Sequence, residues 1–280
     1  MITGSDIAGL LFADTVAGNG FREGIAVDLG LKGHRVIVTA GASGIGRAIA
    51  AAFRSEGAVV TVCDVDEAAL ATVEGMAAAK VDVADRDAVA AFMAQSIEAM
   101  GGLDCLVNNA GIAGPTGGVE DIAPDGWDDT LAVCLTSQFN TTRCAVDALK
   151  ASGNASILNL SSLAGRVGFA MRSPYATAKW GVIGFTKSLA LELGPHGIRA
   201  NAILPGLVAG DRQRRVLEAK SHRLGQTFEE TEAQAFSHVS IKEYVTPQQI
   251  ADQCLFLASY RGRTTSGQAI SICGDTQKLA

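Results

Sequence analysis

The 280-residue sequence predicts an α/β protein with a single domain, built on a parallel, doubly wound sheet of about seven strands with helices on both faces. Two observations lead to this fold class. From residue 34 onward, short apolar segments alternate with longer segments of helical spacing. Seven apolar strands separated by helices require a helical layer on each face of the sheet.

The elements follow in order along the chain. Strands are expected at HRVIVTA (34–40), AVVTVCD (58–64), KVDV (80–83), LDCLVNNAG (103–111), ASILNLSS (155–162), IRANAILPG (198–206) and QAISIC (268–273). Helices are expected between them at GRAIAAAF (46–53), EAALATVEGM (67–76), DAVAAFMAQSIEAM (87–100), about 127–150 and YATAKWGVIGFTKSLALEL (175–193). Each strand except the last is thus followed by a segment long enough to cross back over the sheet.

Two segments stand outside this alternation. Residues 1–30 have loosely helical apolar spacing interrupted by GNG, and we expect an N-terminal extension or arm that packs on the domain or on a partner subunit. Residues 31–280 form the domain itself. Within it, residues 207–245 are an insertion between the last two strands, basic at first and acidic afterwards, which is typical of solvated helix faces.

The composition excludes several classes of protein. Hydrophobic residues make up 48% and charged residues 19%, so the chain is expected to fold as a globular protein. The net charge of −6 gives no electrostatic basis for binding nucleic acid. No apolar run reaches the roughly 18 residues of a membrane span, and no signal-peptide pattern is present. Six scattered cysteines without CxxC spacing indicate no metal site and a reducing, cytoplasmic location.

A glycine-rich turn, TAGASGIG (39–46), falls between the first strand and the first helix. Glycines let the backbone approach a pyrophosphate, and the helix N-terminus offers free N–H donors. Asp64 ends the second strand 20 residues beyond Gly44, where a carboxylate accepts hydrogen bonds from an adenosine ribose. That charge repels the 2′-phosphate of NADP, so NAD is favoured; Arg47, just inside the helix, is the counter-argument.

Tyr175 and Lys179 lie four residues apart at a predicted helix start and share one face. An ammonium close to a phenol favours the phenolate, which suits a general acid/base. On its own, the pair favours a packed tyrosine and a solvated lysine, because such pairs also occur by accident.

Several motifs together resemble the short-chain dehydrogenase/reductase family, and the resemblance covers about residues 31–275. TAGASGIG resembles its TGxxxGxG cofactor turn, with Ala40 in place of the first glycine. The other matching motifs are NNAG (108–111), Asp82 with Val83 after the third strand, the catalytic set Ser162, Tyr175 and Lys179, and the turn PG (205–206). The resemblance implies a Rossmann-like, dinucleotide-binding catalytic domain over residues 31–280.

The resemblance also implies a role for each matched residue. Tyr175 is the general acid/base, Lys179 lowers its pKa and holds the nicotinamide ribose, and Ser162 hydrogen-bonds the substrate oxygen. The cofactor-binding residues that it implies are Gly41, Ser43, Gly44, Ile45, Gly46, Asp64, Asp82, Val83, Asn109, Ala110, Gly111, Tyr175, Lys179, Pro205, Gly206 and Val208. The implied assembly is a homotetramer, with a homodimer as the alternative.

Three positions depart from the family pattern. Cys134, in LAVCLTS, stands where the family usually has an asparagine that helps to hold a water next to the lysine. A thiol is a weak hydrogen-bonding group, so either a backbone carbonyl and water replace the amide, or the enzyme is slow, or Cys134 is a small core residue. Gly210 replaces a threonine that touches the nicotinamide amide, and SICGD (271–275) replaces a DGG.

Arg166 and Arg172 are the substrate candidates, because they lie between the catalytic serine and tyrosine. An arginine there binds a carboxylate, phosphate or sulfonate with two parallel hydrogen bonds. We expect an NAD-dependent dehydrogenase of a small, polar secondary alcohol, with a hydroxy acid or sugar acid as the leading candidates. The alternatives are an NADPH-dependent carbonyl or 3-oxoacyl thioester reductase, and a cofactor-binding regulatory or scaffold protein without activity.

Overall fold

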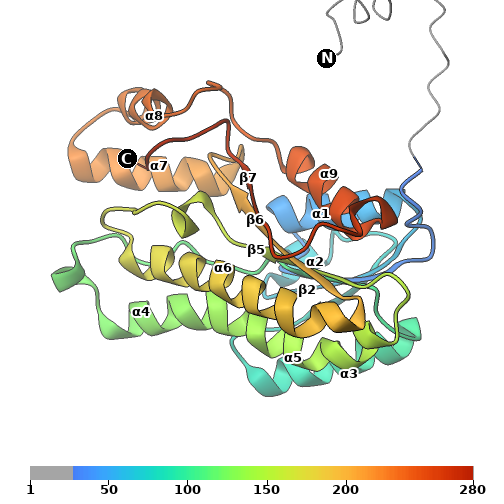
Figure 1. Ribbon diagram of the computed structural model, residues 1–280. Coiled ribbons are helices and arrows are strands. Elements are labelled where there is room, and N and C mark those ends of the chain that lie inside the picture. The colour runs from blue at the N-terminus through green and yellow to red at the C-terminus, as the bar shows by residue number, and fades with distance from the viewer. Residues whose placement is uncertain (1–27, 280) are drawn as a thin grey trace, which may run out of the picture.

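The structure is a computed structural model that describes residues 28–279; the expected N-terminal arm lies almost entirely outside the described residues. Its centre is a seven-stranded sheet in the order β3-β2-β1-β4-β5-β6-β7, with every neighbouring pair parallel (Figure 1). The strands are β1 (Arg35–Thr39), β2 (Val59–Asp64), β3 (Ala77–Lys80), β4 (Cys105–Asn108), β5 (Ser156–Leu160), β6 (Arg199–Pro205) and β7 (Ala269–Ile272). The predicted fold class is confirmed.

Helices cover both faces of the sheet. On one face lie α1 (Gly44–Ser55) and α9 (Pro247–Ala258), and on the other lie α3 (Arg86–Met100), α5 (Ser137–Lys150) and α6 (Ser173–Leu193) (Figure 1). Successive side chains of β1 point to opposite faces. Val36 and Val38 pack with the α1 and α9 layer, whereas Ile37 packs with the other three helices.

The direction of winding changes at β1. The chain runs from β1 outward through β2 to β3, and then returns to place β4 on the other side of β1. In open parallel sheets of this kind, ligands bind at the carboxyl ends of the strands where the order reverses. The loops after β1 and β4 are therefore where the site is expected.

Two predicted elements differ from the structure. The third strand was expected at 80–83 but occupies Ala77–Lys80, pairing with β2 from Thr61 to Asp64. The helix expected over 67–76 is confined to α2 (Glu67–Leu70). The chain bends after that helix because it must return to the sheet edge within a few residues, and Gly75 turns it there with a φ of 66°.

The helical stretch expected from about residue 127 begins earlier and is interrupted. It consists of α4 (Pro124–Leu131), a π-helical turn over Ala132–Thr136, and α5. Such π-turns occur frequently at functional sites. Cys134 lies inside this one, where it is fully buried.

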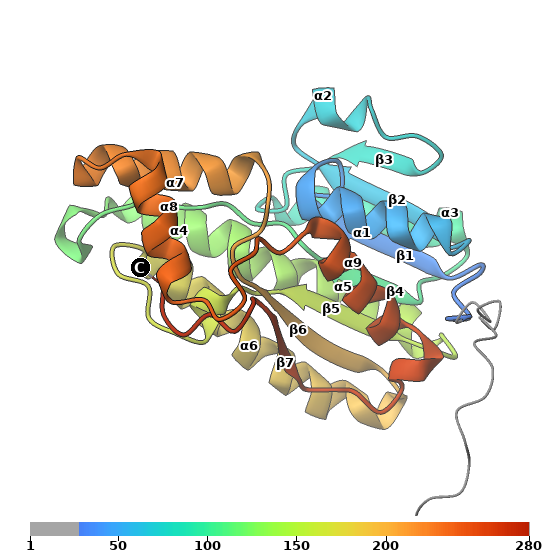
Figure 2. The ribbon, with the colours of Figure 1, turned by 90° about the horizontal axis from the view of Figure 1, so that it is seen from above.

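The insertion after β6 contains two helices, α7 (Asp211–Leu224) and α8 (Phe228–Ser237), which lie beside each other away from the main helical layers (Figure 2). Gly225 ends α7 in the left-handed conformation, and a capping box between Thr227 and Glu230 starts α8. Short 3-10 turns occur at Val119–Asp121, Leu163–Gly165, Gly194–His196 and Tyr260–Gly262. Over residues 28–279, none of the helices has the length and apolar character of a membrane span.

Candidate active site

The glycine-rich turn lies between β1 and α1, as expected. Ala40, which stands where the family that the sequence resembles has glycine, adopts a left-handed φ of 49°, and Gly44 has a φ of 52°. A Cβ added at Gly46 would lie 2.1 Å from the Ala40 carbonyl oxygen, whereas a Cβ at Gly44 would meet nothing within 4 Å. Gly46 is thus needed for packing, and Gly44 leaves an open space over the helix N-terminus. The turn fits a pyrophosphate bound by backbone N–H groups.

The NNAG segment after β4 holds this turn in place. Asn109 donates from Nδ2 to the carbonyl oxygens of Thr39 and Ala40, each at 3.0 Å. The backbone N–H groups of Asn109 and Ala110 both donate to the Thr39 hydroxyl. Thr39 was not among the predicted site residues, although its position at the start of TAGASGIG was a signal. Asn109 and Thr39 therefore fix the two loops relative to each other.

Asp64 lies at the end of β2, nearly buried and beside the glycine turn. Its carboxylate accepts hydrogen bonds from the backbone N–H groups of Ala42, Val65 and Asp66 at 2.8 to 3.2 Å. Arg47, the counter-argument for NADP, is bound elsewhere: it donates to the hydroxyl and the carbonyl oxygen of Thr72. The negative charge at this position is therefore not neutralised by Arg47.

The remaining predicted cofactor residues surround the same end of the sheet. Asp82 and Val83 follow β3, where Val83 is buried and Asp82 accepts from the backbone of Ala84. Pro205 ends β6, and Val208 in the next loop forms a parallel bridge with Val245. The predicted set is thus distributed over the loops after β1, β2, β3, β4 and β6, with Tyr175 and Lys179 on α6.

Ser162, Tyr175 and Lys179 come from two adjoining elements. Ser162 precedes the 3-10 turn after β5, and the other two residues lie on the first turns of α6. Lys179 is 3% exposed, and its Nζ donates to the Leu160 carbonyl oxygen at 2.8 Å and lies 5.7 Å from the centre of the Tyr175 ring. Ser161 donates to the Lys179 carbonyl oxygen, which joins the serine loop to the helix. The three predicted catalytic residues are thereby held in one region.

Cys134, at the position where the family usually has an asparagine, is hydrogen-bonded to the backbone of Ile112. The backbone N–H of Ile112 donates to its Sγ at 3.3 Å, and the thiol donates to the Ile112 carbonyl oxygen at 3.4 Å. Four residues later on the same helical stretch, Gln138 donates to the Leu160 carbonyl oxygen that also accepts from Lys179. The Oε1 atom of Gln138 is buried without a hydrogen-bond partner among the described residues. Gln138 was missed because the motif offered no signal for it.

The two candidate substrate arginines are placed differently. Arg172 is 6% exposed at the start of α6; its Cζ lies 5.5 Å from the centre of the Tyr175 ring, and its Nη2 donates to the Ala113 carbonyl oxygen at 2.5 Å. Burial lowers the pKa of the Arg172 guanidinium. Arg166 is exposed and donates to the hydroxyl of Ser271 on β7. Of the two candidate arginines, only Arg172 adjoins Tyr175.

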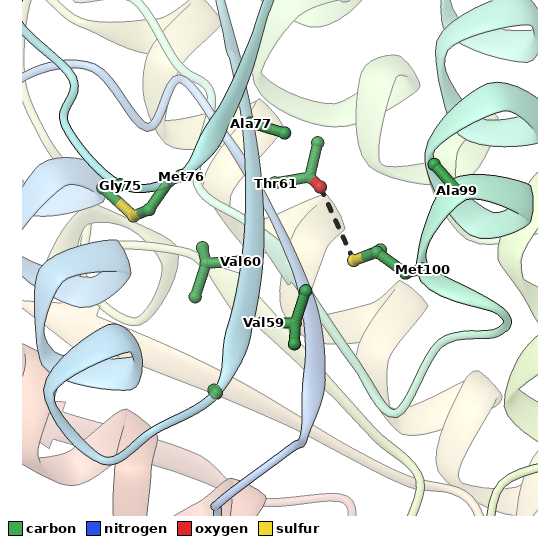
Figure 3. Close-up of a pocket in the computed structure, with 9 residues that line it drawn as sticks. Val59, Val60, Thr61, Gly75, Met76, Ala77, Ala99 and Met100 are labelled. Carbon is green, nitrogen blue, oxygen red and sulfur yellow. Dashed lines mark hydrogen bonds between the residues drawn. The ribbon is translucent and has the colours of Figure 1, made fainter.

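Two surface cavities lie apart from Tyr175. One, of about 560 Å³, is formed by β2, the start of β3 and the end of α3, where Thr61 donates to the sulfur of Met100 (Figure 3). It lies at the opposite end of these strands from the glycine turn. The other, of about 710 Å³, is lined by Arg166, Tyr244 and Asp275 among others, beside the C-terminal segment.

Metal and disulfide chemistry have no visible basis in residues 28–279. No group of three or more metal-ligating side chains comes together there, and all six cysteines are free. Burial raises the pKa of the Cys63 and Cys105 thiols to about 12, so these two are protonated, inert core residues.

Comparisons with known proteins agree with this arrangement. A family model described as enoyl-(acyl carrier protein) reductase matches residues 39–274. The D-beta-hydroxybutyrate dehydrogenase of Cupriavidus necator is 34% identical over 85% of this chain and 95% of its own, and a probable galactose dehydrogenase of Rhizobium meliloti is 34% identical over 87% and 95%. A solved structure of a variant actinorhodin polyketide ketoreductase with NADPH superposes with a TM-score of 0.81 at 33% identity, covering 86% of this chain and 96% of that one.

Proposed function

The chain belongs to the short-chain dehydrogenase/reductase family, and from this premise we propose that it is an NAD-dependent dehydrogenase that interconverts a small, polar secondary alcohol and its ketone. Family membership makes it an oxidoreductase that acts on alcohols or ketones with a nicotinamide cofactor. The single observation that carries the finer proposal is the joint placement of Ser162, Tyr175 and Lys179 near the carboxyl end of β5, beside the NNAG segment, where a Cβ at Gly111 would lie 3.5 Å from the Lys179 Nζ.

The chain's own residues account for the proton transfer. In the oxidation direction, Tyr175 accepts the alcohol proton at its phenolic oxygen, and Ser162 donates a hydrogen bond to the substrate oxygen. Lys179, buried beside the Tyr175 ring, places its positive charge next to the phenol that exchanges the proton. The nicotinamide, when bound, takes up or supplies the hydride. The loops after β1, β2, β3, β4 and β6 would hold the dinucleotide cofactor.

Asp64 supports NAD over NADP. Its carboxylate is oriented by three backbone N–H groups and carries no ion pair among the described residues, so it is available to the two ribose hydroxyls. The related ketoreductase was solved with NADPH, so cofactor preference needs its own test. We expect tighter binding of NADH than of NADPH in a fluorescence titration. Asp64→Ser should weaken the binding of NADH by about 10-fold, which is the effect of losing one charge-assisted hydrogen bond.

The test of the function is absorbance at 340 nm with NAD or NADP against hydroxy acids, sugar acids, polyols and aryl alcohols. Tyr175→Phe is the control, since it removes only the hydroxyl. We expect turnover with NAD that falls by about 10²- to 10⁴-fold in this variant, while NADH affinity stays the same. Turnover that survives in Tyr175→Phe would refute the proposed role of the tyrosine. Binding of NADH without turnover of any class would favour the regulatory alternative.

The proposed enzyme is a homotetramer. Phe139 on α5 and Trp180 and Leu191 on α6 are 48%, 53% and 81% exposed, which is unusual for large apolar side chains on two adjacent helices. We expect sedimentation to show four copies, and Phe139→Glu combined with Trp180→Glu to give smaller species. A wild-type protein that sediments as a monomer at micromolar concentration would contradict this assembly.

A further inference from the structure

Arg172 is a buried cation without a countercharge in the described part of the chain. Only 6% of the residue is exposed, and none of the ion pairs there includes it. Its Nε is buried without a hydrogen-bond partner, and its one hydrogen bond goes to the neutral carbonyl of Ala113. Burying an unpaired charge is costly, so such groups are normally paired with an anion.

A second arginine approaches the same place from another element. Arg212, in the first turn of α7, donates from Nη1 to the carbonyl oxygen of Gly111 at 3.0 Å, two residues before the Ala113 carbonyl held by Arg172. Burial lowers the pKa of the Arg172 guanidinium; Tyr175 opposes this shift, and the nearby charge of Arg212 adds to it. The loop after β4 thus brings two like charges together beside the catalytic tyrosine.

We propose that Arg172 and Arg212 form an anion subsite for the substrate, so that the enzyme acts on a short hydroxy acid whose carboxylate binds these two guanidinium groups. This inference rests on the proposed function and names its substrate class. The carboxylate supplies the countercharge that Arg172 lacks. Because the guanidinium carbon lies 5.5 Å from the centre of the Tyr175 ring, one small molecule spans the distance between subsite and catalytic hydroxyl.

The position of Arg172 adds to its affinity for an anion. It immediately precedes α6, whose N-terminal N–H groups carry a partial positive charge. The Phe169 ring, 5.4 Å from the Arg172 Cζ, packs against the guanidinium and limits its movement. Arg166 shares none of these features, because it is exposed and bonded to Ser271 at the edge of the sheet.

The experiment compares acids with their neutral esters. The probes are pyruvate, acetoacetate and levulinate, which place the carboxylate at increasing distance from the ketone, each beside its methyl ester. Binding to the enzyme–NADH complex is measured by NADH fluorescence, and turnover is measured separately at 340 nm. The variants are Arg172→Gln, Arg212→Gln and Arg166→Gln. Arg215→Gln is the matched control, because Arg215 is an exposed arginine on the same helix as Arg212.

For at least one pair, we expect the acid to bind about 10-fold or more tightly than its ester. Arg172→Gln should weaken the acid by about 10- to 100-fold, as for a lost charge-assisted pair, and change ester binding by less than threefold. Arg212→Gln should also weaken binding of the acid, but by a smaller factor, and Arg215→Gln should leave binding of the acid unchanged. If Arg172→Gln does not fold, the comparison of acid and ester binding in the wild-type enzyme and in Arg212→Gln still tests the subsite.

Three outcomes would overturn the inference. The first is equal binding of acid and ester in every pair. The second is a loss in Arg166→Gln but not in Arg172→Gln, which would place the subsite in the cavity beside β7. The third is an equal loss of acid and ester turnover in Arg172→Gln with a shifted pH profile, which would mean that Arg172 acts through Tyr175. Acid-selective binding without any turnover would instead support the subsite and refute the proposed function.

Discussion

Cys134, which stands where the family usually has an asparagine, forms two hydrogen bonds with the backbone of one residue. The structure buries Cys134 completely, as the third interpretation expects of a small core residue, and it adds hydrogen bonds that none of the three interpretations included: the thiol both accepts from and donates to the backbone of Ile112. Ile112 follows directly on Gly111, so Cys134 helps to hold the loop whose carbonyl groups Arg172 and Arg212 contact. The sequence contains no spacing that would reveal this bond.

Substitutions at Cys134 should separate its packing from its hydrogen bonds. Cys134→Ala removes both hydrogen bonds between the buried thiol and the backbone of Ile112, which are themselves only partly buried, so we expect it to lower the free energy of unfolding by about 1–2 kcal/mol in urea titration. Cys134→Ser keeps a donor and an acceptor at similar size and should lose less. Equal losses in the two variants would show that the thiol contributes only by packing.

At the scale of the elements, prediction succeeded where the pattern was local. The strands β1, β2, β4, β5, β6 and β7 were located from their apolar runs. The strand Ala77–Lys80 was misplaced because AAAK has no strand character of its own; it is a strand only because it pairs with β2. Likewise, the helix after Asp66 was predicted to extend to residue 76, whereas it ends at Leu70. The apolar spacing continues beyond Leu70, but the chain must turn back to the sheet there.

The candidate site was predictable in its motifs and not in its long-range contacts. The glycine-rich turn, the proposed catalytic residues and Asp64 were each predicted from residues close together in sequence. The contact between Arg212 and Gly111 joins residues 101 positions apart, and no sequence pattern indicates it. From the sequence, Arg166 and Arg172 were equivalent substrate candidates. They differ in how deeply their side chains are buried, and this depends on how the loop after β5 packs on α6.

The packing of that loop on α6 depends on Gly165. A Cβ at this residue would lie 2.4 Å from the Lys179 carbonyl oxygen and 2.5 Å from the Ser161 Oγ. We expect Gly165→Ala to lower stability by about 1–3 kcal/mol and to reduce kcat, because it pushes the serine loop away from the helix that carries Tyr175 and Lys179. Gly168→Ala is the matched control, since a Cβ there meets nothing within 4 Å. Similar melting temperatures and kcat in the two variants would contradict this prediction.

At the scale of the whole molecule, the ends of the sheet opposite the site carry a buried charged cluster. Burial lowers the pKa of His34 below its ordinary 6.5; the Asp104 charge opposes this shift and the Arg199 charge adds to it. Burial would raise the pKa of Asp104, but hydrogen bonds from Arg35 and Ser152 outweigh it and hold that pKa well below 3.8. Both groups therefore bind protons more readily in the unfolded chain.

Acid should consequently destabilise the protein in two steps. Stability from neutral His34 is present above pH 6.5 and is lost as the pH falls from 6.5 through its folded pKa; stability from ionised Asp104 is lost only below about pH 4. We expect His34→Gln to flatten the upper step of a plot of unfolding free energy against pH and to leave the lower step. A wild-type curve that rises as the pH falls from 7 to 5 would contradict this.

The helices α7 and α8 bury few side chains, which are Leu217, Ser221 and Thr231. Of the two, α7 contacts the loop after β4 through exposed hydrogen bonds from Arg212 and Arg223 to backbone carbonyl groups. A unit with so little buried apolar surface opens at a lower free energy than the sheet. Titration with urea should therefore abolish activity before the main circular-dichroism transition, which reports the sheet and the helices packed on it. A bound acid that bridges Arg172 and Arg212 would raise the first midpoint and leave the second in place, so substrate itself would determine how much urea the enzyme withstands.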